Sequence, residues 1–172
     1  MPPSARFSLL PATAADATPL AALHTAVARH LTKSYGPGPW SSETSEKGVL
    51  QAMRLSQVYV ARLGAELVGT LRLATRKPWA IDIRYFSACR EPLYLLGMAV
   101  TPDHQRQGIG SRCLREVERI AKAWPADAIR LDAYDAKAGA GRFYSRCGWK
   151  ETGRATYHGV PLVYYELLLA NA

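Results

Sequence analysis

The segment from Pro102 to Ser111, PDHQRQGIGS, contains the residues of this sequence best suited to binding an anion. Gly108 and Gly110 flank Ile109, an apolar stretch that ends at Val100 comes before them, and a helical pattern follows. The first N–H groups of a helix have no partner in the helix and lie at its positive end, so they favour a phosphate group. Glycine lets such a group approach because it has no Cβ. The spacing fits a pyrophosphate site or, more simply, a tight strand-to-helix turn.

Neighbouring side chains add hydrogen-bond donors to this loop. Gln105, Arg106 and Gln107 precede the glycines, and the Ser111 hydroxyl follows them. Two familiar phosphate loops do not fit, because the third glycine of the dinucleotide-binding fingerprint is missing and no Gly-Lys-Ser/Thr follows. The context, an apolar strand directly before and a strongly periodic helix directly after, favours the anion site.

The spacing of apolar residues and the positions of helix-breaking residues predict the helices and strands that position the loop. Apolar residues from Leu20 to Leu31 predict a first helix, which Asp16 or Thr18 can cap and which the YGPGPW stretch ends. The other predicted elements are a strand at 6–10, a helix at 45–55, a hairpin of strands at 58–62 and 67–74, a buried strand at 93–100, a helix with an apolar face from Ile109 to Trp124, a strand at 129–134, a short helix at 138–146 and two strands around His158-Gly159.

This order predicts an α/β (α+β) layered domain with a mixed central sheet of about seven strands flanked by helices. Leu93 to Tyr134 should form a parallel, right-handed strand–helix–strand unit. The length suits one domain over residues 1–172.

Composition narrows the function classes. The formal net charge of +8 favours an anionic partner, namely nucleic acid, a membrane surface or a phosphorylated small molecule, or simply a basic surface. The positive residues are dispersed, which argues against nucleic acid. No apolar window is long enough to span a membrane, and Met1 to Asp16 shows no signal peptide. The odd number of cysteines, without a CxxC pair, predicts free thiols in a reducing cytoplasm, and the scattered histidines predict no metal site.

Several motifs together resemble a known family. Gln105 to Gly110 matches the Q/R-x-x-G-x-G/A signature of the GNAT N-acetyltransferase superfamily. The MAV at 98–100 resembles the end of that family's fourth strand, and RFYSRCGWKETGR at 142–154 resembles its segment with a tyrosine and a GF pair. RFSLLPATAAD at 6–16 is similar to the first strand and the entry to the first helix.

The resemblance implies acetyl-CoA as cofactor. It assigns pantetheine pairing to the main chain of Met98, Ala99 and Val100, with a bulge at Gly97. It assigns the pyrophosphate to the loop, and the basic side chains that follow could meet the 3′-phosphate or adenine end. The residues concerned are Gln105, Arg106, Gln107, Gly108, Ile109, Gly110 and Ser111 in the loop, and Lys137, Arg142 and Arg146 for the nucleotide end.

The same resemblance makes Tyr144 the acid that protonates the departing thiolate. The usual glutamate of the fourth strand is missing, because this chain has Tyr94-Leu95-Leu96-Gly97 there. Asp82, Glu91 and Asp132 are the alternative bases, and an amine that arrives neutral would need none. The expected substrate walls carry Trp40, Trp79 and Asp82, the last as an ammonium partner.

The sequence therefore predicts an acetyl-CoA-dependent N-acetyltransferase acting on a primary amine of a small molecule or peptide. The alternative is a catalytically silent acyl-CoA-binding sensor or scaffold of the same fold. Neither nucleic acid nor membrane is expected as a partner, and a homodimer is left open.

Overall fold

The computed structural model describes residues 5–170, which form two compact units. The first unit contains the described residues up to Leu73 together with Gly97–Glu116, and the second contains Ala74–Leu96 and the described residues from Val117 onward. Strand β4 (Pro92–Val100) and helix α3 (Ile109–Ala123) each begin in one unit and end in the other. That the whole chain forms one domain stays a prediction.

The strands of the described chain form a seven-stranded mixed sheet in the order β1-β2-β3-β4-β5-β7-β6. Strands β4 and β5 pair in parallel, whereas β1–β2, β2–β3, β5–β7 and β6–β7 are antiparallel. The remaining strand bounds are β1 (Phe7–Pro11), β2 (Gln57–Leu63), β3 (Glu66–Ala74), β5 (Ala128–Tyr134), β6 (Lys150–Tyr157) and β7 (Val160–Leu168). The predicted fold class is confirmed.

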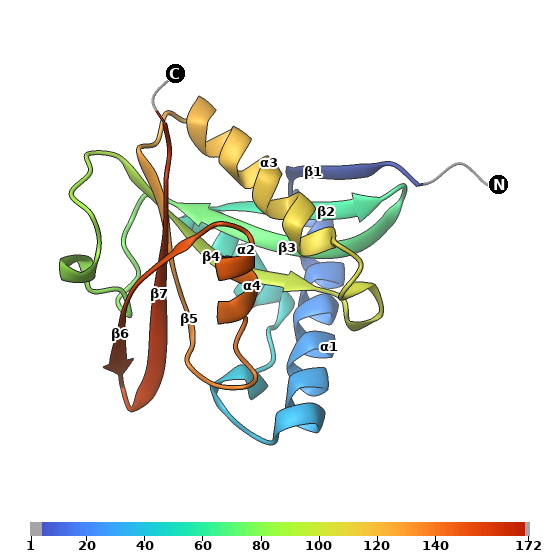
Figure 1. Ribbon diagram of the computed structural model, residues 1–172. Helices are drawn as coiled ribbons and strands as arrows, with labels where there is room; N and C mark the ends of the chain where they lie inside the picture. Colours follow the sequence, from blue (N-terminus) through green and yellow to red (C-terminus); the bar gives the residue numbers. More distant parts are fainter. Residues whose placement is uncertain (1–4, 171–172) are drawn as a thin grey trace. The chain divides into compact units, whose positions relative to one another are not determined.

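In the first unit, helices α1 (Ala17–Tyr35) and α2 (Glu46–Leu55) lie side by side against β2 (Figure 1). Their shared core consists of Ala17, Leu20, Val49, Val58 and Val60. Asp16 precedes α1, as expected, but its carboxylate accepts hydrogen bonds from the Thr13 N–H and from Arg62 rather than capping α1. Thr18 lies inside the helix and is not a cap.

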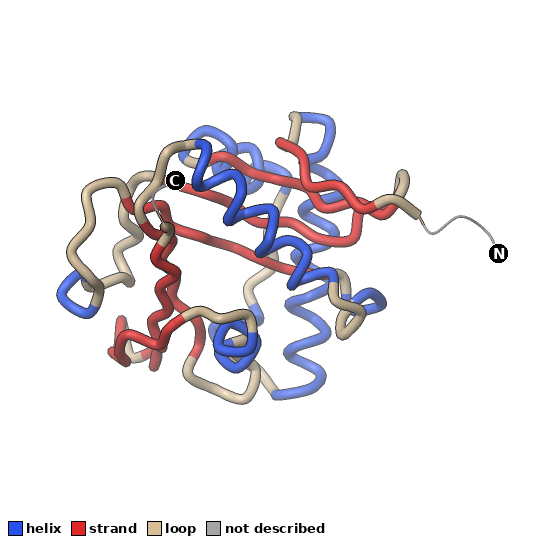
Figure 2. Tube along the Cα trace, turned by 45° about the horizontal axis from the view of Figure 1, so that its top comes forward, coloured by secondary structure: helices blue, strands red, loops and turns tan. Residues whose placement is uncertain are grey.

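In the second unit, β5, β7 and β6 form an antiparallel ribbon beside the short helix α4 (Gly141–Arg146), as Figure 2 shows. One core cluster consists of Ile81, Tyr94, Leu162 and Tyr164. The β6–β7 turn is as predicted, and both His158 and Gly159 adopt left-handed backbone angles that suit a tight hairpin.

Three predicted details are wrong. The strand at 93–100 is buried only from Leu93 to Leu95, and its second half is partly exposed. The helix expected at 138–146 starts only at Gly141, because a tight turn precedes it in which a Cβ on Gly139 would lie 1.9 Å from the Tyr134 carbonyl oxygen. Helix α3 ends at Ala123, so Trp124 lies beyond it and is exposed.

Within the described chain, no helix combines the length and apolar character needed to cross a membrane. The same residues contain no group of three or more histidine, cysteine, aspartate or glutamate side chains that could hold a metal ion. Cys89, Cys113 and Cys147 are all free, as predicted, and burial raises the pKa of the Cys113 thiol to about 11. The Cys113 thiol is therefore protonated at neutral pH.

A buried ion pair fastens the long β3–β4 connection in the second unit. Arg130 on β5 bonds Glu166 on β7 with an Nε–Oε2 distance of 2.9 Å, and the two side chains are only 6% and 2% exposed. The Arg130 guanidinium also donates to the Ser87 carbonyl oxygen, and the Ser87 N–H donates to Glu166. Phe86 stacks beneath the guanidinium at 5.0 Å. Both charges are thus satisfied by each other and by the loop.

Glu166→Ala would leave the Arg130 guanidinium buried without its carboxylate. We expect the free energy of unfolding to fall by about 3–5 kcal/mol, measured by urea denaturation followed by circular dichroism. Glu43→Ala is the control, because the Arg29–Glu43 pair is exposed and its loss should cost less than about 1 kcal/mol. If the free energy of unfolding fell by the same small amount in both variants, the buried pair would not be a major contribution to stability.

Candidate active site

The Gln105–Ser111 loop lies in the first unit, where Gln105 to Gly108 join the 3₁₀ turn Pro102–His104 to helix α3 and the last three residues begin that helix. Arg106 and Gly108 both have left-handed backbone angles, with φ of 59° and 80°. A Cβ on Gly108 would meet no atom within 4 Å. Gly108 is therefore needed for its backbone conformation, and the space beside it is open. Gly110 belongs instead to the first turn of α3.

The two glutamines of this loop are hydrogen-bonded to the backbone, and their role toward an anion stays a prediction. The Gln105 amide donates to the Val100 carbonyl oxygen at 3.1 Å, and the Gln107 amide donates to the Asp103 carbonyl oxygen at 2.8 Å. Both side chains thus fasten the loop to the backbone before it. Donors suited to an anion here include the first N–H groups of α3, which have no partner within the helix, and the exposed side chain of Arg106.

The end of β4 lies in the same unit as the loop. The glycine expected to interrupt the strand, Gly97, is exposed and has a left-handed φ of 56°, as in a glycine bulge. Met98, Ala99 and Val100 follow it and are half-buried. The Ala99 carbonyl oxygen would lie 3.1 Å from a Cβ on Gly69, a tight contact, so glycine on β3 allows the backbone of Ala99 to approach closely at that point.

Tyr144 lies in the second unit, on α4, and is buried among aromatic rings. Its ring centroid is 5.2 Å from Phe143, 5.8 Å from Trp149 and 5.7 Å from Tyr165. Burial raises the pKa of the Tyr144 phenol well above its ordinary value, and the charge of Asp132 raises it further. The phenol therefore carries its proton throughout the neutral pH range. Lys137 and Arg142 belong to the same unit and are exposed.

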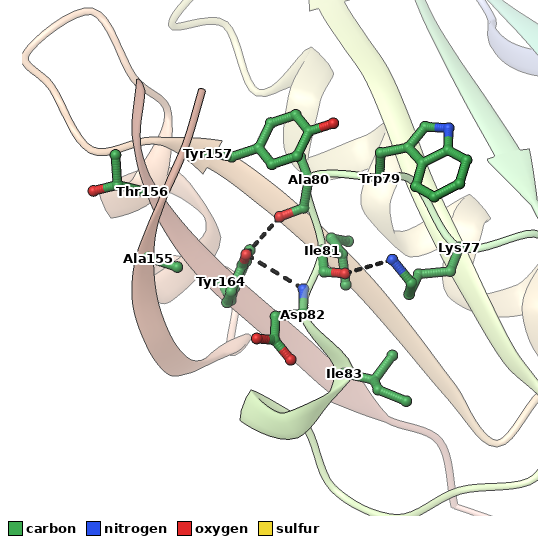
Figure 3. Close-up of a pocket in the computed structure, with 10 residues that line it drawn as sticks. All are labelled: Lys77, Trp79, Ala80, Ile81, Asp82, Ile83, Ala155, Thr156, Tyr157 and Tyr164. Atoms are coloured by element: carbon green, nitrogen blue, oxygen red, sulfur yellow. Dashed lines mark hydrogen bonds between the residues drawn. The ribbon is translucent and has the colours of Figure 1, made fainter. Parts of the chain in front are cut away.

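Figure 3 shows a pocket of about 360 Å³ in the second unit, with Trp79 and Asp82 in its wall. The Tyr164 hydroxyl donates to the Ala80 carbonyl oxygen and accepts from the Asp82 N–H, which holds this wall against β7. The full lining is Lys77, Trp79, Ala80, Ile81, Asp82, Ile83, Ala155, Thr156, Tyr157 and Tyr164.

Trp40, the third predicted substrate residue, lies in the first unit and does not line this pocket. Its indole N–H donates to the Gly36 carbonyl oxygen at 2.9 Å, and its ring covers Gly38 so closely that a Cβ there would lie 2.4 Å from it. The structure thus brings Trp79 and Asp82 together and gives Trp40 a structural role in its own loop.

The predicted role of Asp82 as an ammonium partner or base is not supported. Arg84 already binds the Asp82 carboxylate through Nε and Nη2, the latter at 2.6 Å. The hydrogen bonds from Arg84 lower the pKa of Asp82 to about 2. A base this weak removes a proton poorly at neutral pH. Of the other two candidates, Glu91 is exposed, whereas Asp132 is half-buried on β5 and burial raises its pKa.

Arg72 on β3 was not singled out from the sequence, although it interrupts the apolar pattern LVGTLRLA. It is half-buried and donates only weakly, at 3.4 Å, to the Ser56 hydroxyl. Among the described residues, no carboxylate forms an ion pair with Arg72. Burial and the charge of Arg72 lower the pKa of His24, which favours a neutral imidazole. The first unit therefore holds a partly buried cation that could accept a carboxylate.

The Arg84–Asp82 contact can be tested by titration. In ¹³C NMR spectra, the Asp82 carboxyl should titrate with a pKa near 2, and Arg84→Ala should return it towards the ordinary 3.8. Because the folded-state pKa is lowered, the contact's contribution to stability is present above pH 3.8 and is lost as the pH falls through about 2. Arg90→Ala, an exposed change in the same connection, is the control. An Asp82 pKa unaffected by Arg84→Ala would refute the contact.

Comparison with solved structures places this fold among acetyltransferases. A GNAT-family acetyltransferase from Listeria monocytogenes has a TM-score of 0.71 at 22% identity. The match covers 94% of the present chain and 95% of the Listeria chain. The protein yncA from Salmonella typhimurium, solved with its cofactor acetyl-CoA, has a TM-score of 0.67 at 16% identity. This match covers 96% of the present chain and 95% of yncA. At these identities the likeness concerns the fold.

A curated relative adds a short match in sequence. The chain is 31% identical to GCN5-related N-acetyltransferase 10, chloroplastic, from Arabidopsis thaliana over 67 residues. The match spans 39% of this chain and only about a quarter, 26%, of the plant protein.

The family model described as the acetyltransferase (GNAT) family matches residues 25–149, which is well over half of the chain. This region contains the loop, both halves of β4 and Tyr144. The protein therefore belongs to the GNAT acetyltransferase family, whose acyl donor is acetyl-CoA.

Proposed function

We propose that this protein transfers the acetyl group of acetyl-CoA to a primary amine of a small molecule or peptide. The observation that carries the proposal is the Gln105–Ser111 loop, where Gly108 leaves open space at the start of a 15-residue helix. The first N–H groups of a helix have no partner within the helix, and together with the positive end of the helix dipole they favour a pyrophosphate there. The exposed Arg106 side chain adds a cation.

The residues present fit acetyl-CoA in two further respects. Met98 to Val100 follow a left-handed glycine and are not fully buried, so their backbone can pair with an extended chain such as pantetheine. Lys137 and Arg142 are exposed basic side chains suited to the 3′-phosphate or adenine end, as is Arg146. When bound, acetyl-CoA supplies an acyl carbon activated as a thioester.

Tyr144 is proposed as the acid of the reaction. Its raised pKa keeps the phenol protonated until negative charge develops nearby, and a thiolate that leaves a thioester is such a charge. Its packing among Phe143, Trp149 and Tyr165 restricts the ring, which favours a fixed donor position. The second proton lost by the amine nitrogen can restore the phenol.

The acceptor is proposed to bring an apolar or aromatic body. Trp79 is 80% exposed, and Tyr157 and Ile81 line the same pocket, so an apolar group could cover the indole. The free thiols favour a reducing compartment such as the cytoplasm. Neither nucleic acid nor membrane is proposed as a partner, and a homodimer remains open.

A panel of amines tests the activity. Purified protein would be mixed with acetyl-CoA and benzylamine, phenethylamine, free amino acids, or peptides with a free N-terminus or a lysine. Mass spectrometry would detect the acetylated product and a thiol reagent the released CoA. We expect turnover with at least one amine. Acetyl-CoA binding without any turnover would favour the silent sensor or scaffold instead.

Gly110→Val tests the anion site. A branched side chain in the first turn of α3 would crowd the helix start, so we expect the dissociation constant for CoA, measured by calorimetry, to rise at least tenfold, or about 1.4 kcal/mol. Gly48→Val is the matched control, because Gly48 lies in the first turn of α2. Unchanged CoA affinity in Gly110→Val would remove the pyrophosphate role.

Tyr144→Phe tests the acid. The ring is kept, so CoA binding should hardly change, while kcat should fall by about 100- to 10,000-fold because general-acid catalysis is lost. Tyr165→Phe is the control, since it removes another phenol from the same aromatic cluster. A kcat near that of the wild type, measured where chemistry limits the rate, would make Tyr144 a packing residue only.

A further inference from the structure

We infer that Asp132 is the catalytic base, the group that takes a proton from the ammonium of the incoming acceptor. The inference rests on the proposed acetyl transfer and adds to it the residue that replaces the missing strand glutamate. It also specifies that the acceptor arrives as an ammonium ion.

Strand β5 loses one of its neighbours just before Asp132. The parallel ladder of β4 and β5 covers only Pro92 to Tyr94 against Ala128 to Arg130. On the other side, β5 stays paired with β7 through Tyr134, and Asp132 lies opposite Tyr164. Asp132 is therefore on a strand held firmly by β7, at a point where no pairing with β4 is present in the described chain.

Side-chain alternation places Asp132 on the pocket-bearing face of this ribbon. Arg130 and Asp132 are two residues apart and share a face with their partners Glu166 and Tyr164. That face is covered by the β3–β4 connection, through the Arg130–Ser87 and Tyr164–Ala80 hydrogen bonds. Tyr164 also lines the pocket. A substrate held by the pocket wall would thus lie on the same side of β5 as Asp132.

Tyr144 reaches the same region from the opposite face. Its ring packs on Tyr165, which is next to Tyr164 and so points to the other side of β7. The charge of Asp132 nevertheless contributes to the raised pKa of Tyr144. A carboxylate and a phenol therefore approach one edge of β5 from its two faces. This is the arrangement needed if a base acts on one reactant and an acid on the other.

Asp132 has no cation of its own. No ion pair includes it among the described residues, and the nearby Arg130 is neutralised by Glu166. The titratable and charged groups on the elements packed here are Arg130 and Tyr134 on β5, Tyr164 and Glu166 on β7, Tyr94 on β4, Tyr144 on α4, and Asp82 and Tyr85 in the β3–β4 connection, where Arg84 is bound to Asp82. Burial raises the pKa of Asp132, which makes it a stronger base than an ordinary aspartate. An ammonium would supply the missing positive charge.

The step balances in atoms and charge. Asp132 accepts one proton from the ammonium, and the freed nitrogen lone pair forms the N–C bond to the acetyl carbon as the C–S bond breaks. The sulfur receives a proton from Tyr144. The nitrogen's second proton returns to the tyrosinate, and Asp132 later releases its proton to water. The net products are the amide, CoA thiol and one proton.

Asp132→Asn is the test variant, and Asp135→Asn, which alters an exposed carboxylate on the same segment, is the matched control. The probes are benzylamine, which is an ammonium at pH 7, and phenylhydrazine, which is neutral there and needs no base. We expect kcat with benzylamine to fall by about 100- to 10,000-fold in Asp132→Asn. The rate with phenylhydrazine should change less than tenfold. The acidic limb of the benzylamine pH profile, where activity rises as Asp132 loses its proton, should disappear.

Two measurements separate this role from a structural one. Asp132→Asn removes a partly buried charge, so its midpoint of urea unfolding at pH 7 should be no lower than that of the wild type. The Asp132 carboxyl, followed by ¹³C NMR, should titrate above the ordinary aspartate value in the wild type. Equal loss of activity with both probes, or an ordinary Asp132 pKa, would overturn the inference.

The remaining outcomes distinguish this inference from the proposed function. An active wild type with an equally active Asp132→Asn variant overturns the base and leaves acetyl transfer intact. A wild type that turns over phenylhydrazine but no aliphatic amine also overturns the base. A wild type that acetylates nothing in the panel overturns the proposed function and the base with it.

Discussion

The buried Arg130–Glu166 pair is the interaction on which the second unit depends. It joins neighbouring strands and also satisfies both backbone groups of Ser87, so a long irregular connection is held where it would otherwise be loose. The pocket wall belongs to that connection, and Tyr164, two residues before Glu166, holds it at a second point. Burying both charges costs desolvation free energy, which is offset by the contact between them and by their hydrogen bonds to Ser87.

The unit uses its carboxylates in different ways because their partners differ. The carboxylate of Asp82 is bound by the guanidinium of Arg84, two residues away. This contact lowers the pKa of Asp82 and balances its negative charge. Glu166 is neutralised from the neighbouring strand. Asp132 has neither kind of partner, and burial moves its pKa in the opposite direction from that of Asp82. Three acids on one ribbon and its covering loop therefore differ in reactivity through environment alone.

Sequence patterns predicted most of the fold, because breakers and apolar spacing act locally. Gly36 after Tyr35, Ser45 before α2 and the His158-Gly159 turn each mark a boundary by their own conformational preference. The start of α4 was predicted too early because the turn at Gly139 depends on contact with a carbonyl five residues earlier. Local spacing carries no signal for such an approach.

The functional residues were predicted less completely than the fold. A sequence motif identifies which positions belong to a site, but it does not give the hydrogen-bond partners of their side chains. Gln105 and Gln107 belong to the loop as expected, yet both amides are bound to carbonyl oxygens of the backbone. Asp82 was expected to pair with a substrate ammonium or to act as a base, and its pairing with Arg84 could be predicted only from the conformation of the β3–β4 connection. Arg72 could have been noticed as a lone charge in an apolar strand. The roles of Tyr144 and the loop remain predictions.

The left-handed backbone at Arg106 has a consequence for how this sequence can vary. A residue with a Cβ pays about 1–2 kcal/mol to adopt that conformation, whereas glycine does so freely. Mutation to glycine would thus relax the loop, and selection for stability alone would favour it. The same mutation would remove an exposed positive charge from the helix start, so at this position conformational stability and local charge change in opposite directions.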